Sequence, residues 1–126
     1  MGRLIAALVV ASGALSAVQS FAHHSIAAMY RENESVSIQG EVSQLHFRNP
    51  HSIIHVIVKD RGGREMRYAV EWSAAGELED QGVTSQTLKI GDVVVITGSP
   101  ARNAAYRRIR MNTLRRPKDN YTYKSF

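Results

Sequence analysis

The feature that most constrains the fold of this chain is a pair of extended segments joined by a tight turn. Residues 51–59 carry apolar side chains on both faces of an extended chain, which is typical of a strand covered on both sides. Asp60-Arg61-Gly62-Gly63 follows and predicts a hairpin turn. The segment after the turn alternates, and one of its faces carries Met66, Tyr68, Val70 and Trp72. The chain must therefore build an antiparallel sheet, which favours a β-rich fold.

Three further segments of this 126-residue chain predict strands around that hairpin. Residues 36–47 alternate, but their apolar positions change parity near the end, so we expect a bulge or bend with Gly40 as its candidate site. A tight turn at Leu88-Lys89-Ile90-Gly91-Asp92 leads into the apolar segment 93–98. Residues 106–114 alternate again and predict a strand. Five strands are therefore expected.

A short helix is expected between the third and fourth strands. Ser73 has the side chain of an N-cap, the residues after it favour a helix, and Gly82 would end it. Five strands, the first of them bent, with a helix in this place resemble the OB-fold, a five-stranded Greek-key barrel. The turn at 88–92 also resembles the start of the fourth strand in many such barrels. The alternative is an open β-sandwich with one helix.

The N-terminal residues predict export. Arg3 supplies a positive charge, residues 4–18 form an apolar run, and Ser20-Phe21-Ala22 offers small residues at the two positions that a signal peptidase reads. We interpret 1–22 as a signal peptide and expect the mature protein in the periplasm. The alternative is an uncleaved membrane anchor, but the run falls short of the roughly 20 apolar residues that cross a bilayer.

The predicted mature chain divides into three parts. Residues 23–34 form an N-terminal arm, 35–116 the barrel domain, and 117–126 a polar C-terminal tail. No other stretch is long and apolar enough to cross a membrane, so no transmembrane segment is expected in the mature chain. The sequence has no cysteine, which excludes disulfides, thiolate metal sites and a thiol nucleophile.

Four short motifs follow one another along the chain: His23-His24-Ser25, Asn49-Pro50-His51, Val70-Glu71-Trp72, and Leu88-Lys89-Ile90-Gly91-Asp92 with Gly98. With these motifs the chain resembles a family of small exported bacterial proteins of unknown function. Members of that family begin their mature chains with His-His-Ser and carry Asn-Pro-His after the first strand. The resemblance implies export and a shared fold, and no activity comes with it.

The two histidines after the predicted cleavage site point to a metal site. Cleavage before His23 would leave an α-amine and an imidazole on one residue, and these two groups form a chelate ring. The α-amine titrates at about pH 8, so part of it is free at neutral pH. Nitrogen donors of this kind favour copper among the divalent metals. We expect His51, held by the Asn49-Pro50 turn, as a third ligand, with His24 as the alternative. The competing interpretation is an inert terminus and an ordinary turn histidine.

The register of the first hairpin decides where the remaining histidines lie. His51 and His55 are separated by about 13 Å along one strand and cannot share an ion. If His46 faces Ile53, it lies diagonally between the other two, close enough for two imidazoles to share an ion. A turn one residue longer or shorter would move His46 to the other face.

A second hypothesis is a binding module without metal. OB barrels bind oligosaccharides and oligonucleotides across the face of their second and third strands, where we name Asn49, His55 and Trp72 as candidate ligand-binding residues. Aromatic rings near arginines would suit an anionic glycan, another envelope polymer or a periplasmic partner protein. Nucleic acid is not expected as a partner of an exported protein. The competing interpretation is that Trp72 belongs to the core.

No enzymatic activity is expected. The acidic residues are not paired for acid–base work, and the chain has neither a nucleophile elbow nor a phosphate-binding loop. Glu71 ends a strand beside Trp72 and is expected to be a solvated carboxylate. The formal charge of +5, concentrated in the second half, predicts a solvated basic face.

Overall fold

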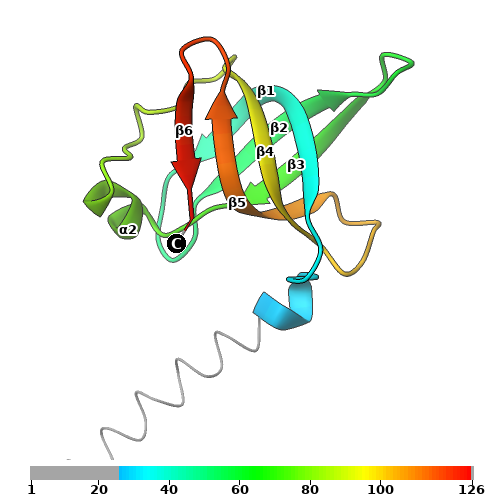
Figure 1. The fold of residues 1–126 in the computed structure, drawn as a ribbon, viewed down its shortest axis with the longest axis horizontal. Helices are drawn as coiled ribbons and strands as arrows, with labels where there is room; N and C mark the ends of the chain where they lie inside the picture. The colour runs from blue at the N-terminus through cyan, green and yellow to red at the C-terminus, as the bar shows by residue number, and fades with distance from the viewer. Residues whose placement is uncertain (1–25, 126) are drawn as a thin grey trace, which may run out of the picture.

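A parallel pairing between two strands closes the sheet of this protein into a barrel. The computed structural model describes residues 26–125, and its strands are β1 (Val36–His46), β2 (Ile53–Lys59), β3 (Glu65–Glu71), β4 (Val93–Pro100), β5 (Arg108–Arg116) and β6 (Tyr121–Lys124). β1 pairs with β2 and β4, β2 pairs with β3, and β4 pairs with β5, so the parallel β3–β5 contact completes a ring of five strands (Figure 1). The predicted OB-like barrel, with a helix between the third and fourth strands, is confirmed.

The β2–β3 hairpin forms as the sequence predicts. Its two strands stay in register along the whole length of β2. Asp60 organises the turn, because its Oδ1 accepts hydrogen bonds of 2.9 Å from the backbone N–H groups of Gly62 and Arg64. Gly63 takes a φ of 79°, which a residue without a Cβ adopts at little cost. The turn therefore uses the aspartate and glycine from which the sequence predicts it.

The bulge in β1 lies beyond the position that the sequence predicts. The register against β2 shifts between Val42 and Gln44, whereas Gly40 stays paired with Val94 of β4. Gly40 instead allows two strands to approach closely, because a Cβ there would lie 2.2 Å from the carbonyl oxygen of Ile57. The prediction of a bulge at Gly40 is therefore wrong, and the glycine is required by the close passage of β1 over β2.

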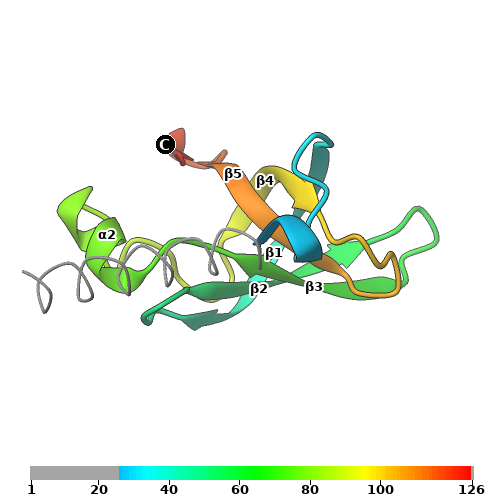
Figure 2. The same cartoon turned by 90° about the horizontal axis from the view of Figure 1, so that it is seen from below.

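Helix α2 (Ala75–Asp80) lies at the end of the barrel opposite the β2–β3 turn (Figures 1 and 2). Its N-cap is Ala74, which makes no side-chain hydrogen bond, so the prediction of Ser73 as the cap is wrong. The side chain of Asn49 acts in its place, since its Oδ1 accepts a 3.2 Å hydrogen bond from the N–H of Gly76. Within residues 26–125 there is no helix with the length and apolarity that a bilayer span requires.

The interior of the barrel is the hydrophobic core. Side chains that alternate along the strands point inward, and the fully buried ones include Val42, Ile54, Val56, Val70, Val94 and Ile96. Leu78 of α2 is also fully buried and closes one end. Burial of these side chains supplies the main stabilisation, because the chain has no disulfide to restrain its unfolded state.

A sixth strand, β6, extends the sheet beyond the five-stranded ring. The sequence predicts a polar tail for 117–126, with aromatic side chains scattered through it at Tyr121, Tyr123 and Phe126. β6 covers the first two of these. Tyr121 and Tyr123 face the barrel: Tyr123 is 7% exposed, and Tyr121 packs against the core. β6 therefore covers an edge of β5 with two aromatic side chains, a pattern too short to predict a strand.

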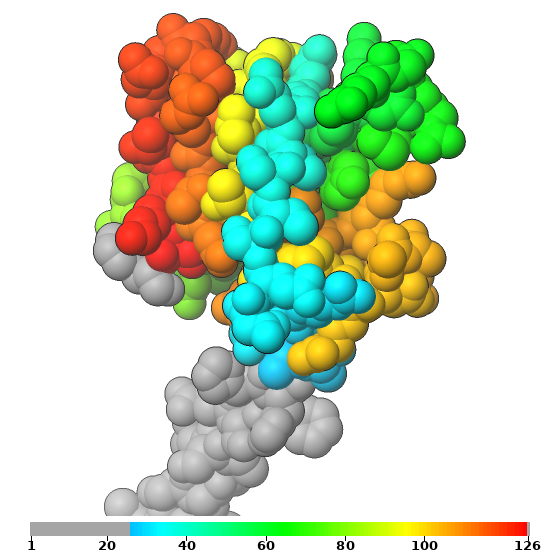
Figure 3. All heavy atoms as spheres, turned by 45° about the vertical axis from the view of Figure 1, so that its right-hand side comes forward, coloured from blue at the N-terminus to red at the C-terminus, as the bar shows by residue number. Residues whose placement is uncertain are grey.

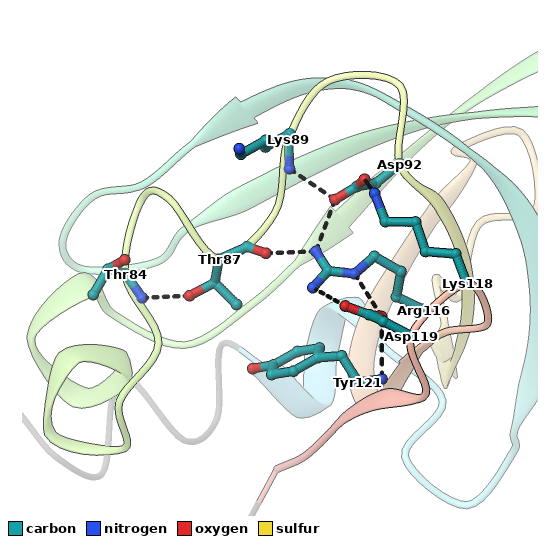
Figure 4. A network of polar contacts seen from close by, with 8 residues as sticks. All are labelled: Thr84, Thr87, Lys89, Asp92, Arg116, Lys118, Asp119 and Tyr121. Carbon is teal, nitrogen blue, oxygen red and sulfur yellow. Dashed lines mark hydrogen bonds and ion pairs between the residues drawn. The ribbon is translucent and has the colours of Figure 1, made fainter.

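A buried carboxylate joins the start of β4 to the turn between β5 and β6 (Figure 4). Asp92 is 5% exposed and accepts hydrogen bonds from the Lys89 N–H (3.0 Å), the Arg116 guanidinium (2.9 Å) and Lys118 Nζ (2.6 Å). Burial alone would raise the pKa of Asp92, but these hydrogen bonds, led by that of Lys118, lower it to about 2. Asp92 is thus an ionised anchor of the fold.

Candidate functional site

The carboxylate of Glu71, at the end of β3, meets three side chains from separate parts of the chain. Tyr30, from the N-terminal arm, donates a hydrogen bond from its hydroxyl to Oε2. Nδ1 of His51, in the loop between β1 and β2, lies 3.5 Å from Oε1. Nη2 of Arg108, at the start of β5, lies 3.6 Å from Oε2. The Glu71 side chain is 12% exposed, so these contacts replace most of its water. We call these four residues the Glu71 cluster.

The N-terminal arm brings Tyr30 to the cluster. Residues 26–29 form one helical turn, and Tyr30 then makes a β-bridge with Ala101. Figure 3 shows the arm packed against the loop that follows β4. Burial, followed by the hydrogen bond and the negative charge of Glu71, raises the pKa of Tyr30 to about 12, although Arg108 opposes this shift. Tyr30 therefore keeps its proton and stays a hydrogen-bond donor over the physiological range.

Ser52 fixes the loop that carries His51. The side chain of Ser52 is fully buried, and its Oγ lies 3.2 Å from both the N–H and the carbonyl oxygen of Arg48. The N–H of Ser52 donates to the carbonyl of Ser73 (3.0 Å), and its carbonyl accepts from the N–H of Trp72 (2.8 Å). The His51 side chain is 46% exposed. The His51 imidazole is therefore half-exposed, while the backbone beside it is fixed by the contacts of Ser52 with Arg48 and with the residues that follow β3.

A cleft of about 310 Å³ opens beside the Glu71 cluster. It is lined by both sides of the loop, including the cis Asn49–Pro50 peptide, and by Arg48, His51, Ile53, Glu71 and Arg108. Nδ1 of His51 faces Glu71, which leaves Nε2 as the ring nitrogen without this contact on a half-exposed side chain. The cleft thus combines one available imidazole nitrogen with a largely neutralised carboxylate–guanidinium pair.

The predicted site residues lie in different environments. His23 and His24 fall outside the described residues 26–125. His51 joins the Glu71 cluster. Asn49 lines the cleft, but its side-chain oxygen binds the first turn of α2. Trp72 is 4% exposed and packs edge to face against an aromatic ring of β6, so its indole offers no face to a ligand in solution.

His55 lies on the outer face of β2, where it meets His46. The hairpin register places His46 opposite Ile53, the arrangement on which the pairing of these histidines depends. The ring centroids of His46 and His55 are 5.7 Å apart, and the ring planes cross at 85°. The bulge in β1 places Gln44 directly opposite His55. The register therefore brings two imidazoles together, and leaves His51 to a separate cluster.

The sequence pattern does not point to Tyr30 or Arg108 as site residues, and it predicts a solvated carboxylate at Glu71. That last prediction is wrong, because the side chain is 12% exposed and meets three partners. One signal was available: Tyr30 is the one aromatic residue within 23–34. A large aromatic residue in a short terminal arm indicates a docking point, but the sequence does not identify the residue that it contacts.

Among residues 26–125, no group of three or more His, Cys, Asp or Glu side chains is arranged to hold a metal ion. The Glu71 cluster supplies one imidazole and one carboxylate. A metal ion bound at His51 would therefore take its other protein ligands from elsewhere in the chain.

A family model described as "Family of unknown function (DUF6152)" matches residues 9–109. The match includes all four members of the Glu71 cluster and ends within β5. No curated protein matches the chain.

Proposed function

The chain belongs to the DUF6152 family, a family of unknown function, and from its own residues we propose that it is an exported periplasmic protein that binds one copper ion. The proposed ligands are the α-amine and imidazole of His23, with His51 as the third nitrogen donor and His24 as the alternative. The contact between His51 and the carboxylate of Glu71 carries this proposal.

That contact is typical of a histidine prepared for a metal. A metal-binding imidazole nearly always turns its second ring nitrogen toward a carboxylate or a carbonyl, which fixes the tautomer and orients the ring. Nδ1 of His51 lies 3.5 Å from Oε1 of Glu71, so Nε2 is left for the metal. Tyr30 and Arg108 hold the carboxylate in turn, and this support is absent from an ordinary surface histidine.

The docked arm provides the second line of support. Tyr30 and His51 contact the same carboxylate, so the arm already passes beside the residues of the cleft. His23 precedes Tyr30 by seven residues. With 26–29 helical and the rest extended, that length of chain spans about 16 Å. The arm is therefore long enough to bring the amine and imidazole of His23 to the open side of His51.

The donor set determines the metal. The amine and imidazole of His23 with the imidazole of His51 make three nitrogen donors, and imidazole-rich sites of this kind bind Cu(II) most strongly in the divalent affinity order. The carboxylate of Glu71 remains behind His51 and offsets part of the charge of the ion. Because all three nitrogens must be unprotonated, copper binding weakens as the pH falls.

The first test measures the intact mass of the exported protein and then titrates the same sample with Cu(II), followed by electron paramagnetic resonance. We expect a chain that begins at His23 and holds one Cu(II) with a nitrogen-rich signal. A histidine-free extension of four residues before His23 should abolish the tight site, because it moves the α-amine away from both terminal imidazoles and so removes the chelate ring. His51→Ala should weaken binding, whereas the matched variant His46→Ala should leave the first equivalent unchanged.

Two results would contradict the proposal. One is a chain that begins at another residue; the other is copper affinity no tighter than that of a short His-His peptide. If removal of His23 and His24 leaves the binding properties unchanged, the basic face and the strand 2–3 surface become the place to search. An anionic glycan, another envelope polymer or a partner protein would then be the ligand class to assay.

A further inference from the structure

We infer a second metal site on the outer face of the barrel, in which His46 of β1 and His55 of β2 hold one divalent transition-metal ion between their imidazoles. The site does not depend on the proposed terminal chelate, because both residues lie in paired strands outside the Glu71 cluster. Ile54 and Val56, the neighbours of His55, are fully buried, so the alternation of the strand directs His55 outward.

The separation of the two rings fits a shared ion. A metal ion bound by two imidazoles lies about 2.0–2.1 Å from each ring nitrogen, which leaves the ring centres about 5–6 Å apart. The centroids of His46 and His55 are 5.7 Å apart. The planes cross at 85°, so rotation about the side-chain bonds is enough to aim a nitrogen of each ring at one point. His46 is the last residue of β1 and is half-buried.

The surroundings of the His55 ring also support a bound metal ion. Its Nδ1 is buried and has no hydrogen-bond partner among the described residues. Buried polar atoms without a partner are rare, and each needs a physical reason. Burial, followed by the positive charges of Arg67, His46 and Arg108, lowers the pKa of His55. A lowered pKa favours the unprotonated ring, the form that a metal ion binds.

Nearby positive charges set the character of the site. Arg67 donates to Oε1 of Gln44 (2.6 Å), and Arg108 faces Glu71, so neither guanidinium is bonded to the histidines. Their charges still oppose a bound cation. Two protein ligands with water in the remaining positions make an open site. We therefore assign it to an exchangeable ion, bound more weakly than copper at the terminal site, with Cu(II) preferred over Zn(II).

The test uses the chain with the same four-residue extension before His23, in which the proposed terminal chelate is disabled. Calorimetric titration with Zn(II) should show one ion per chain. Loss of a residue that merely supports a ligand weakens metal binding about 10–100-fold, so loss of either ligand should cost at least that range. His46→Ala and His55→Ala should each weaken Zn(II) binding accordingly, and His51→Ala should not change it.

A spectroscopic readout removes the dependence on folding of the variants. In the extended chain without these substitutions, Zn(II) should shift the ring resonances of His46 and His55 and leave those of His51 in place. Absence of Zn(II) binding, or equal binding by His46→Ala and His55→Ala, would overturn the site. The two proposals fail separately: loss of tight copper binding on N-terminal extension tests the terminal site, while Zn(II) binding by that same extended chain tests the His46–His55 pair.

Discussion

Replacing Tyr30 by phenylalanine tests whether one hydroxyl group fastens the N-terminal arm to the barrel. Tyr30 is 1% exposed. Phenylalanine would keep the packing of its ring and remove the O–H that donates to Glu71. The carboxylate keeps its longer contacts with His51 and Arg108. A hydrogen bond to a charged group contributes about 1.5–3 kcal/mol. We expect Tyr30→Phe to lower the free energy of unfolding at pH 7 by about 2 kcal/mol.

The raised pKa of Tyr30 adds a pH dependence to this prediction. Burial and then Glu71 raise it from 10.0 to about 12. At 1.36 kcal/mol for each pKa unit, that shift corresponds to about 2.7 kcal/mol. The folded state holds the proton more tightly than the unfolded state, so this stability is complete below pH 10 and is lost as the pH rises to about 12. Tyr30→Phe has no such loss, and the two proteins should converge in stability near pH 12.

Urea denaturation at pH 7 and through the alkaline range measures both effects on the same samples. Tyr106→Phe is the matched control, because Tyr106 is 64% exposed and should change stability by less than about 0.5 kcal/mol. The difference between the parent protein and Tyr30→Phe cancels the titration of every other group. A difference at pH 7 no larger than that of the control, or one that stays constant up to pH 12, would refute the reasoning.

Four further substitutions test other positions in the fold. Glu71→Gln should weaken Cu(II) binding about 10–100-fold in the titration described above, because it removes the charge behind the histidine ligand; Glu65→Gln should not. The pKa of Asp92, lowered from 3.8 to about 2, contributes about 2 kcal/mol that is complete above pH 4 and lost as the pH falls to 2. Acid unfolding followed by circular dichroism should show this loss in the parent protein and not in Asp92→Asn. Gly40→Ala should destabilise by about 3 kcal/mol in thermal denaturation, because the added Cβ meets a carbonyl oxygen at 2.2 Å. Gly76→Ala, whose Cβ would contact nothing within 4 Å, should stabilise α2 by up to about 1 kcal/mol.

Local rules predicted the barrel because its connections are short and built from diagnostic residues. Asp60 accepts two backbone hydrogen bonds in the turn that it helps to predict. Gly82 takes a φ of 78° and ends α2 where the sequence predicts. The sequence also identifies the register in which His46 faces Ile53 as the one that brings His46 near His55. It predicts the accompanying bulge at the wrong residue.

Contacts between distant residues were not predictable in the same way. The capping oxygen of α2 comes from Asn49 rather than from Ser73, because a loop that is remote in sequence lies against the helix. Gly40 is required by the carbonyl of Ile57, a residue on the neighbouring strand. In both cases the residue type signals a special position, and the physical reason depends on a partner that only the folded chain supplies.

The Glu71 cluster is the strongest case, because closure of the barrel creates it. The parallel β3–β5 pairing sets Ala69 opposite Arg108 and thereby brings the guanidinium beside the carboxylate at the end of β3. The connection between β4 and β5 contains Ala101, which forms a β-bridge with Tyr30 of the arm. A change that opens this one seam would therefore separate Arg108 and Tyr30 from Glu71 and leave His51 without its support. Stability of the seam and copper affinity should fall together, whereas changes at the β2–β3 turn, at the opposite end from α2, should alter stability alone.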